Sequence, residues 1–118
     1  MIRRLSESSQ EVLELEFSGK ITGKDMDGLE PVLDDYFDEF EDVRILVILK
    51  DITGFDSGGL LKEFKLGWKC WGKKGKIAVV GQKKWEELSV KLEALFQKAD
   101  EKYFDIAKIE EARDWLKS

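Results

Sequence analysis

The sequence contains no histidine and has one cysteine, Cys70, and one proline, Pro31. Histidine is the usual general base near neutral pH and the commonest protein ligand for metals, so its absence argues against familiar acid–base catalysis and a conventional zinc site. A single cysteine cannot close a disulfide within the chain, which favours a reducing compartment. We therefore expect a cytoplasmic, non-enzymatic protein that carries neither a cofactor nor a metal ion.

Long apolar runs and nucleotide-binding motifs are also missing. No apolar run approaches the roughly 20 residues that span a bilayer, and the first residues lack the apolar core of a signal peptide. Neither a phosphate-binding loop of the G-x-x-x-x-G-K-[ST] type nor a G-x-G-x-x-G fingerprint occurs. The net charge of -5 argues against a nucleic-acid partner, which needs a dominant basic face. A soluble domain is expected.

The chain alternates segments typical of strands and helices. Its 118 residues, 42% of them hydrophobic, suit one domain over residues 1–118. Apolar and charged residues alternate with period two along residues 11–17, as in a half-buried strand. The five predicted strands are residues 2–5, 11–17 (ending before Gly19), 43–49, 77–80 and 103–106.

Four helices are expected between and after these strands. Thr22, with Asp25 three residues later, is typical of an N-cap, and apolar residues then recur at helical spacing as far as Phe40. Pro31 lies inside this pattern and marks either a kink or the first turn of a second helical piece. The other three helices are predicted at residues 57 to about 74, 83–99 and 107–116.

This order of elements predicts an α/β fold. Within the predicted strand 43–49, residues 45–49 form an unbroken apolar run, which is typical of a parallel strand covered on both faces. The two leading strands suit a hairpin, and the later strands alternate with helices that act as crossovers. We expect a mixed, mainly parallel sheet of about five strands with about four helices.

The junction after the central strand is the most distinctive local motif. A short loop is predicted at residues 50–55, followed by Asp56, Ser57, Gly58 and Gly59 at the start of a helix. Ser57 suits an N-cap, and the helix dipole would favour a phosphate on it or an anion beside it. Plain helix capping by Asp56 and Ser57 is the simpler interpretation, and no residue set here specifies a reaction.

The junction and three further motifs resemble those of a known protein family. The sequence reads Phe-Ser-Gly-Lys-Ile-Thr at 17–22, Ile-Ala-Val-Val-Gly-Gln-Lys-Lys-Trp at 77–85, and Tyr-Phe-Asp at 103–105 before Ala-Arg-Asp-Trp-Leu at 112–116. The junction and element order resemble the STAS domain of SpoIIAA, the anti-anti-sigma factor. Over essentially the whole chain, the sequence is more similar to the small bacterial SpoIIAA-like proteins, which implies a SpoIIAA/STAS-like fold.

The resemblance also implies two kinds of function. In anti-sigma antagonists the serine directly after the aspartate is phosphorylated by a partner kinase, and Ser57 holds that place. Here Gly58 replaces a second serine and Leu61 replaces a second glycine, which departs from the pattern that a kinase would recognise. The SpoIIAA-like group has instead been discussed as binding small apolar ligands or membrane surfaces and as forming dimers.

Charge and aromatic residues are unevenly distributed along the chain. Residues 25–42 hold nine acidic side chains and no basic one, whereas residues 62–76 hold six lysines. A helix with aromatic residues on one face and lysines on another can lie on an anionic membrane. The simpler interpretation is that the aromatic face packs on the sheet while the lysines stay in water.

The sequence therefore favours a binding module over an enzyme. The predicted ligand is a small apolar or amphipathic molecule, or a membrane surface that the protein meets peripherally, and a protein partner or a second copy of the chain is a further expectation. The predicted contacts, on the first two helices and the loop between them, are Phe37, Phe40, Phe55, Leu61, Phe64, Trp68 and Trp71, with Lys62, Lys65 and Lys69 for a head group. A phosphorylation switch at Ser57 is the alternative.

Overall fold

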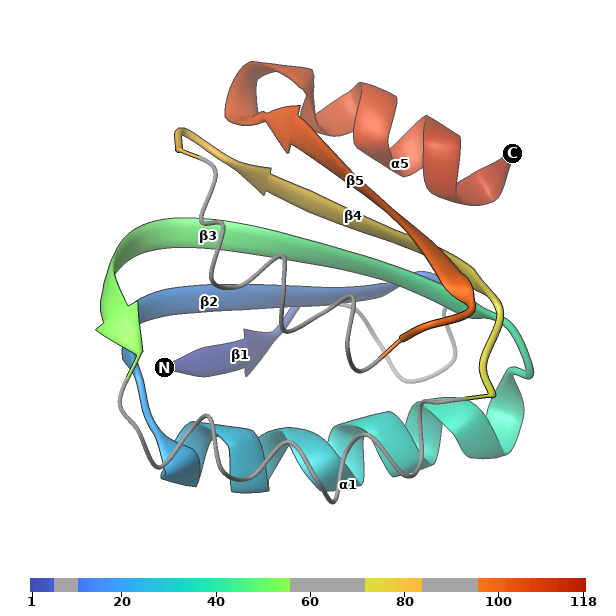
Figure 1. Cartoon of the computed structure of the whole chain (residues 1–118), viewed down its shortest axis with the longest axis horizontal. Helices are drawn as coiled ribbons and strands as arrows, with labels where there is room; N and C mark the ends of the chain where they lie inside the picture. The colour runs from blue at the N-terminus through green and yellow to red at the C-terminus, as the bar shows by residue number, and fades with distance from the viewer. Residues whose placement is uncertain (6–10, 56–71, 84–95) are drawn as a thin grey trace.

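The fold centres on a five-stranded sheet in the order β1-β2-β3-β4-β5 (Figure 1). The structure is a computed structural model, and it describes residues 1–5, 11–55, 72–83 and 96–118. The strands are β1 (Ile2–Arg4), β2 (Leu13–Ile21), β3 (Val43–Phe55), β4 (Gly75–Gly81) and β5 (Ala99–Asp105). The helices are α1 (Gly23–Glu39) and α5 (Ile109–Lys117), with a 3-10 turn, η1 (Ile106–Lys108), before α5.

The strand directions confirm the predicted mixed, mainly parallel sheet. β1 runs antiparallel to β2, with Ile2 opposite Phe17, as expected for the leading hairpin. The other three neighbouring pairs, β2–β3, β3–β4 and β4–β5, are all parallel. Two of the four expected α-helices fall within the described ranges, and the expected second and third helices lie largely outside them.

Each face of the sheet packs against one of the two described helices. Figure 1 shows α1 and α5 on opposite sides of the sheet. Leu15 of β2 and Val47 of β3 pack with Leu33 of α1, whereas Leu46 and Val80 pack with Leu116 of α5. Residues along β3 therefore alternate between two buried faces. This explains why residues 45–49 of the central strand are apolar without alternation, as the sequence predicted.

The first helix begins at the predicted cap. The Thr22 hydroxyl accepts a hydrogen bond from the Asp25 backbone N–H at 3.2 Å, and the Asp25 carboxylate accepts one from the Thr22 N–H at 2.8 Å. Together they form a capping box that satisfies two backbone donors at the helix start. α1 then continues unbroken past Pro31, which is exposed, so Pro31 does not begin a second helical piece.

Several predicted boundaries are wrong because strands extend where a partner strand is available. β2 continues through Gly19 to Ile21, and β3 covers residues 50–55, where a loop was predicted, because these two stretches pair with each other. β5 begins at Ala99, where a helix was expected to end, because Ala99 pairs with Gly75. Residues 72–74 and 96–98 are not helical, although the sequence placed the ends of the second and third predicted helices there.

The final helix also starts later than predicted. Residues 106–108 form the 3-10 turn η1, and α5 begins at Ile109 rather than at Ala107. The Asp105 carboxylate accepts a hydrogen bond from the Ala107 N–H at 3.0 Å, which ends the last strand and begins this turn. Ile106, predicted to end the strand, is consequently turned out and is 37% exposed.

Candidate functional site

An irregularity in the pairing of β2 with β3 produces the candidate site. Ser18 pairs with Lys50, Gly19 with Ile52, and Lys20 with Gly54, so Asp51 has no partner on β2. Asp51 has a φ of 51°. This value lies in the left-handed region of backbone conformation, which residues other than Gly, Asn and Asp seldom adopt. Such bulges are uncommon in parallel pairs and change the direction in which a side chain points.

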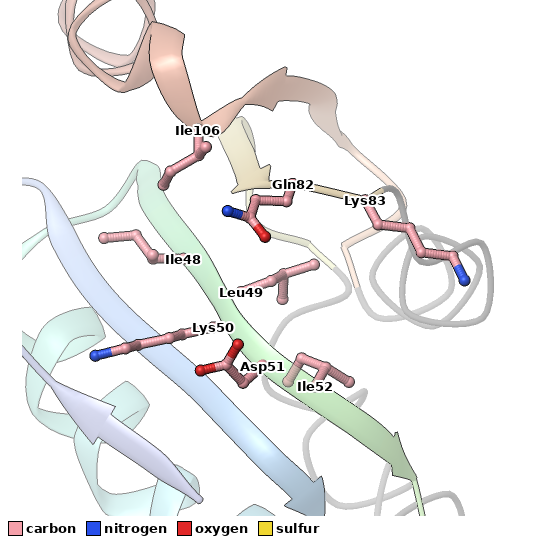
Figure 2. Close-up of a pocket in the computed structure, with 8 residues that line it drawn as sticks. All are labelled: Ile48, Leu49, Lys50, Asp51, Ile52, Gln82, Lys83 and Ile106. Atoms are coloured by element: carbon pink, nitrogen blue, oxygen red, sulfur yellow. The ribbon is translucent and has the colours of Figure 1, made fainter.

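A cavity of about 530 Å³ opens beside this bulge (Figure 2). It lies toward the carboxyl ends of β3 and β4, close to the turn that follows β5. Ligands of open α/β sheets characteristically bind outside the carboxyl ends of the strands. Its volume lies within the roughly 300–1,000 Å³ typical of small-molecule sites. The lining residues are Ile48, Leu49, Lys50, Asp51, Ile52, Gln82, Lys83 and Ile106.

The cavity wall combines apolar and polar side chains. Ile48, Ile52 and Ile106 supply apolar surface on different sides. Figure 2 shows the Asp51 carboxylate and the Gln82 amide between two lysines, Lys50 and Lys83, whose side chains extend in opposite directions. The wall can therefore contact an apolar body while a carboxylate and an amide meet its polar group.

The two central polar groups are held by the sheet on either side. Asp51 is carried by the bulge in β3, and Gln82 follows directly on Gly81, the last residue of β4. The Tyr103 hydroxyl donates a hydrogen bond to the Gly81 carbonyl at 2.6 Å, which fixes the chain just before Gln82. Burial first, and then the negative charge of Asp105, raises the pKa of Tyr103, so this hydroxyl keeps its proton near neutral pH.

The side chain of Asp51 is available to a ligand. Within the four described ranges it makes no hydrogen bond or ion pair, and it is exposed. Gln82 likewise makes none with the residues described there. The Asp51 carboxylate lies at the bulge and lines the cavity, and it has no partner among the described residues. It is therefore suited to accept hydrogen bonds from a bound molecule.

Two predicted ligand contacts lie in a different part of the molecule. Phe37 and Phe40 are half-buried at the end of α1 and pack against the core on that side of the sheet. Phe40 caps α1 three residues before β3 begins, so both rings lie near the amino end of β3, whereas the cavity lies toward its carboxyl end. The Lys73 ammonium lies 4.8 Å from the centre of the Phe37 ring.

The other predicted site residues are not brought together by the described part of the chain. Phe55 is the last residue of β3. The remaining predicted contacts, the Asp-Ser-Gly-Gly junction and the single cysteine lie outside the described residues: Asp56, Ser57, Gly58, Gly59, Leu61, Lys62, Phe64, Lys65, Trp68, Lys69, Cys70 and Trp71.

Sequence reasoning missed Asp51, Gln82 and Ile106. The one available signal was the charged pair at 50–51 with Gly54 close behind, and it was interpreted as a loop. Charged residues followed by glycine are as typical of a bulge at the end of a strand as of a loop. Nothing in the local spacing distinguishes the two, because the bulge depends on how β2 pairs.

The described residues also lack a metal-binding cluster and a membrane-spanning helix. There, no group of three cysteine, aspartate or glutamate side chains is placed to hold a metal ion. In the same ranges, no helix has both the length and the apolar character needed to cross a bilayer.

Comparison with known proteins agrees with this architecture. The model of the SpoIIAA-like family matches residues 12–117. The chain is similar to a crystal structure of an uncharacterised protein from Shewanella loihica, which belongs to the DUF3478 family and has a SpoIIAA-like fold. The TM-score is 0.71 at 24% sequence identity, covering 98% of this chain and 93% of that one. No curated protein matches this chain.

Proposed function

Because this chain belongs to the SpoIIAA-like family, we propose that it is a non-enzymatic STAS-like module that binds a small amphipathic ligand. The proposed site is the cavity beside the carboxyl ends of β3 and β4. The observation that carries the proposal is the bulge at Asp51, which places a charged side chain without a described partner on the wall of that cavity. The family and the fold do not by themselves identify a ligand.

The bulge is more readily explained by binding than by stability. Aspartate tolerates the left-handed region better than most residues, but this conformation still costs up to about 1 kcal/mol relative to ordinary strand geometry. The bulge also interrupts the hydrogen-bonded pairing of β2 with β3, which runs up to Ser18 opposite Lys50 and continues to Ile21 opposite Phe55. Bulges of this kind concentrate beside binding sites, where they redirect a side chain.

The apolar part of the wall supports the amphipathic class. Ile106 is one of the few large apolar side chains that the described residues leave exposed, and it borders the cavity together with Ile48 and Ile52. Each 40 Å² of apolar surface that a ligand covers contributes about 1 kcal/mol. A short hydrocarbon chain therefore gains affinity on this wall, while its polar group lies against Asp51 and Gln82.

The direct test is an amide NMR titration with 1-hexanol as the probe. We expect the shifts to concentrate at residues 48–52, 82–83 and 106, and we expect Ile106→Asn to weaken binding about tenfold by placing an amide on the apolar wall. Leu5→Asn is the matched control, because Leu5 is 42% exposed and does not line the cavity. Shifts confined to the surroundings of Phe37 and Phe40 would instead favour the site predicted from the sequence.

A switch at Ser57 is the second candidate function, supported by the length of β3. Because β3 extends to Phe55, the Asp56-Ser57 pair follows directly after the strand that carries the cavity. In the sequence, Ser57 is the second residue after the end of that strand. Intact-mass measurement of freshly purified protein, with peptide mapping, tests for this group. In a pure switch, Ser57→Asp changes binding to a protein partner and leaves hexanol binding unchanged.

A further inference from the structure

We propose that Asp51 makes the cavity selective for small organic cations, namely protonated amines that carry a short apolar chain. The inference rests on the proposed function, since it names the class of ligand for the same cavity. It starts from the Asp51 carboxylate, which lies among apolar side chains and near the Gln82 amide. The pairing of β2 with β3 sets the backbone conformation at Asp51.

The carboxylate is the only acidic group that the described residues place on this wall. Its side chain has a single methylene, and the bulge fixes the backbone that carries it, so its position varies little. An ammonium group has three N–H donors and no acceptor. Asp51 offers two acceptor oxygens, and the Gln82 amide oxygen is a further acceptor on the same wall.

The two lysines on the wall argue at first for an anionic ligand instead. Figure 2 shows Lys50 and Lys83 extending away from each other, so that their ammonium groups lie at the ends of long side chains, outside the space between Asp51 and Gln82. All three charged residues are exposed, so exposure does not distinguish them. What distinguishes Asp51 is its short side chain, which keeps the carboxylate beside the bulge, whereas each lysine carries its charge at the end of a long side chain.

The net charge of the whole chain also favours a cationic ligand. With 25 acidic and 20 basic residues, the protein carries a net charge of -5. A negative net charge raises the local concentration of small cations and lowers that of small anions. Since this contribution is not specific to one site, the test must separate it from the effect of Asp51.

Three probes of equal chain length separate these effects: hexylammonium, 1-hexanol and hexanoate, titrated at pH 7 against the full chain. We expect hexylammonium to bind about tenfold more tightly than hexanol, and hexanoate to bind most weakly, because a charge-assisted hydrogen bond is roughly twice as strong as a neutral one. Amide shifts at residues 48–52 and 82–83 report binding in the cavity rather than on the acidic surface.

Asp51→Asn is the decisive variant, because asparagine keeps the size of the side chain and also tolerates the left-handed region. We expect it to reduce hexylammonium binding to the level of hexanol and to leave hexanol within about twofold, since only the charge is removed. Asp51→Gly is the second variant, because glycine adopts this φ freely and so preserves the bulge. Lys83→Gln is the control of opposite charge, which should keep the order of the three probes.

The possible results have distinct meanings. A hexylammonium preference that both Asp51 variants abolish supports the inference. Hexanoate binding more tightly than hexylammonium, a preference below threefold, or a larger preference that survives in Asp51→Asn would overturn it while leaving the binding module intact. Failure of all three probes to bind in the cavity would overturn the proposed function itself.

Discussion

The hydroxyl of Tyr36 accepts a hydrogen bond from the backbone N–H of Arg44 at 3.0 Å. The same hydroxyl donates to the carbonyl of Glu11 at 2.6 Å, and the Tyr36 side chain is fully buried. One oxygen on α1 thus joins the start of β3 to the segment that leads into β2. This contact holds the amino ends of two parallel strands against the helix that connects them.

Replacing Tyr36 with phenylalanine should destabilise the protein by about 1–3 kcal/mol, because the Arg44 N–H and the Glu11 carbonyl would lose a buried partner. Urea denaturation followed by circular dichroism measures this change. Tyr103→Phe is the matched control, since it removes one hydrogen bond, to Gly81, from a less buried site. It should cost about 0.5–1.5 kcal/mol. Equal losses in the two variants would contradict the proposed role of Tyr36.

Stability should fall in strong alkali, partly through Tyr36. Burial raises the pKa of Tyr36 and outweighs the hydrogen bond from Arg44, which lowers it. A raised folded-state pKa contributes stability that is fully present below the unfolded pKa of about 10, and this stability is lost as the pH rises through the folded pKa. The free energy of unfolding, measured between pH 9 and 11, should therefore fall less steeply in Tyr36→Phe than in the wild type.

Gly75 is a position where a single methyl group should prevent normal folding. A Cβ there would lie 2.0 Å from the Val43 carbonyl oxygen, and the φ of Gly75 is 141°. We expect Gly75→Ala to cost at least about 3 kcal/mol, through backbone clash and an unfavourable conformation. Gly28→Ala is the control, because Gly28 is an exposed residue of α1 with open space at its Cβ position. It should stabilise the protein by about 0.5–1 kcal/mol in thermal denaturation.

The sequence predicted the fold where local pattern decides the structure. The period-two alternation before Gly19 identified β2, the Thr22–Asp25 spacing identified the start of α1, and the unbroken apolar run identified a strand covered on both faces. Strand ends were wrong where pairing decides the structure. Gly19 and Lys50 each lie where the sequence ended a predicted strand, yet each continues its strand because the neighbouring strand supplies hydrogen-bond partners.

The candidate site was less predictable than the fold. Phe37 and Phe40 were among the predicted contacts, and in the structure these rings pack against the core beside Tyr36, with ring centres 5.8 and 5.1 Å from the Tyr36 ring. Asp51 became a candidate only once the register between β2 and β3 was known. A bulge arises from the alignment of two strands that are distant in the sequence, and periodicity within either strand does not encode it.

The cap of α1 should make the protein sensitive to acid. Burial raises the pKa of Asp25, but hydrogen bonds from Thr22 and the nearby Met1 ammonium, 3.2 Å away, together lower it below its ordinary value. A lowered folded-state pKa contributes stability that is present above the unfolded pKa of about 3.9 and is lost as the pH falls through the folded pKa. Asp25→Asn should therefore cost about 1 kcal/mol at pH 7, and this difference should shrink towards zero near pH 2 in urea denaturation. The exposed Asp38→Asn variant, later in the same helix, is the control; a pH-independent difference for Asp25→Asn would rule out the charge as the cause.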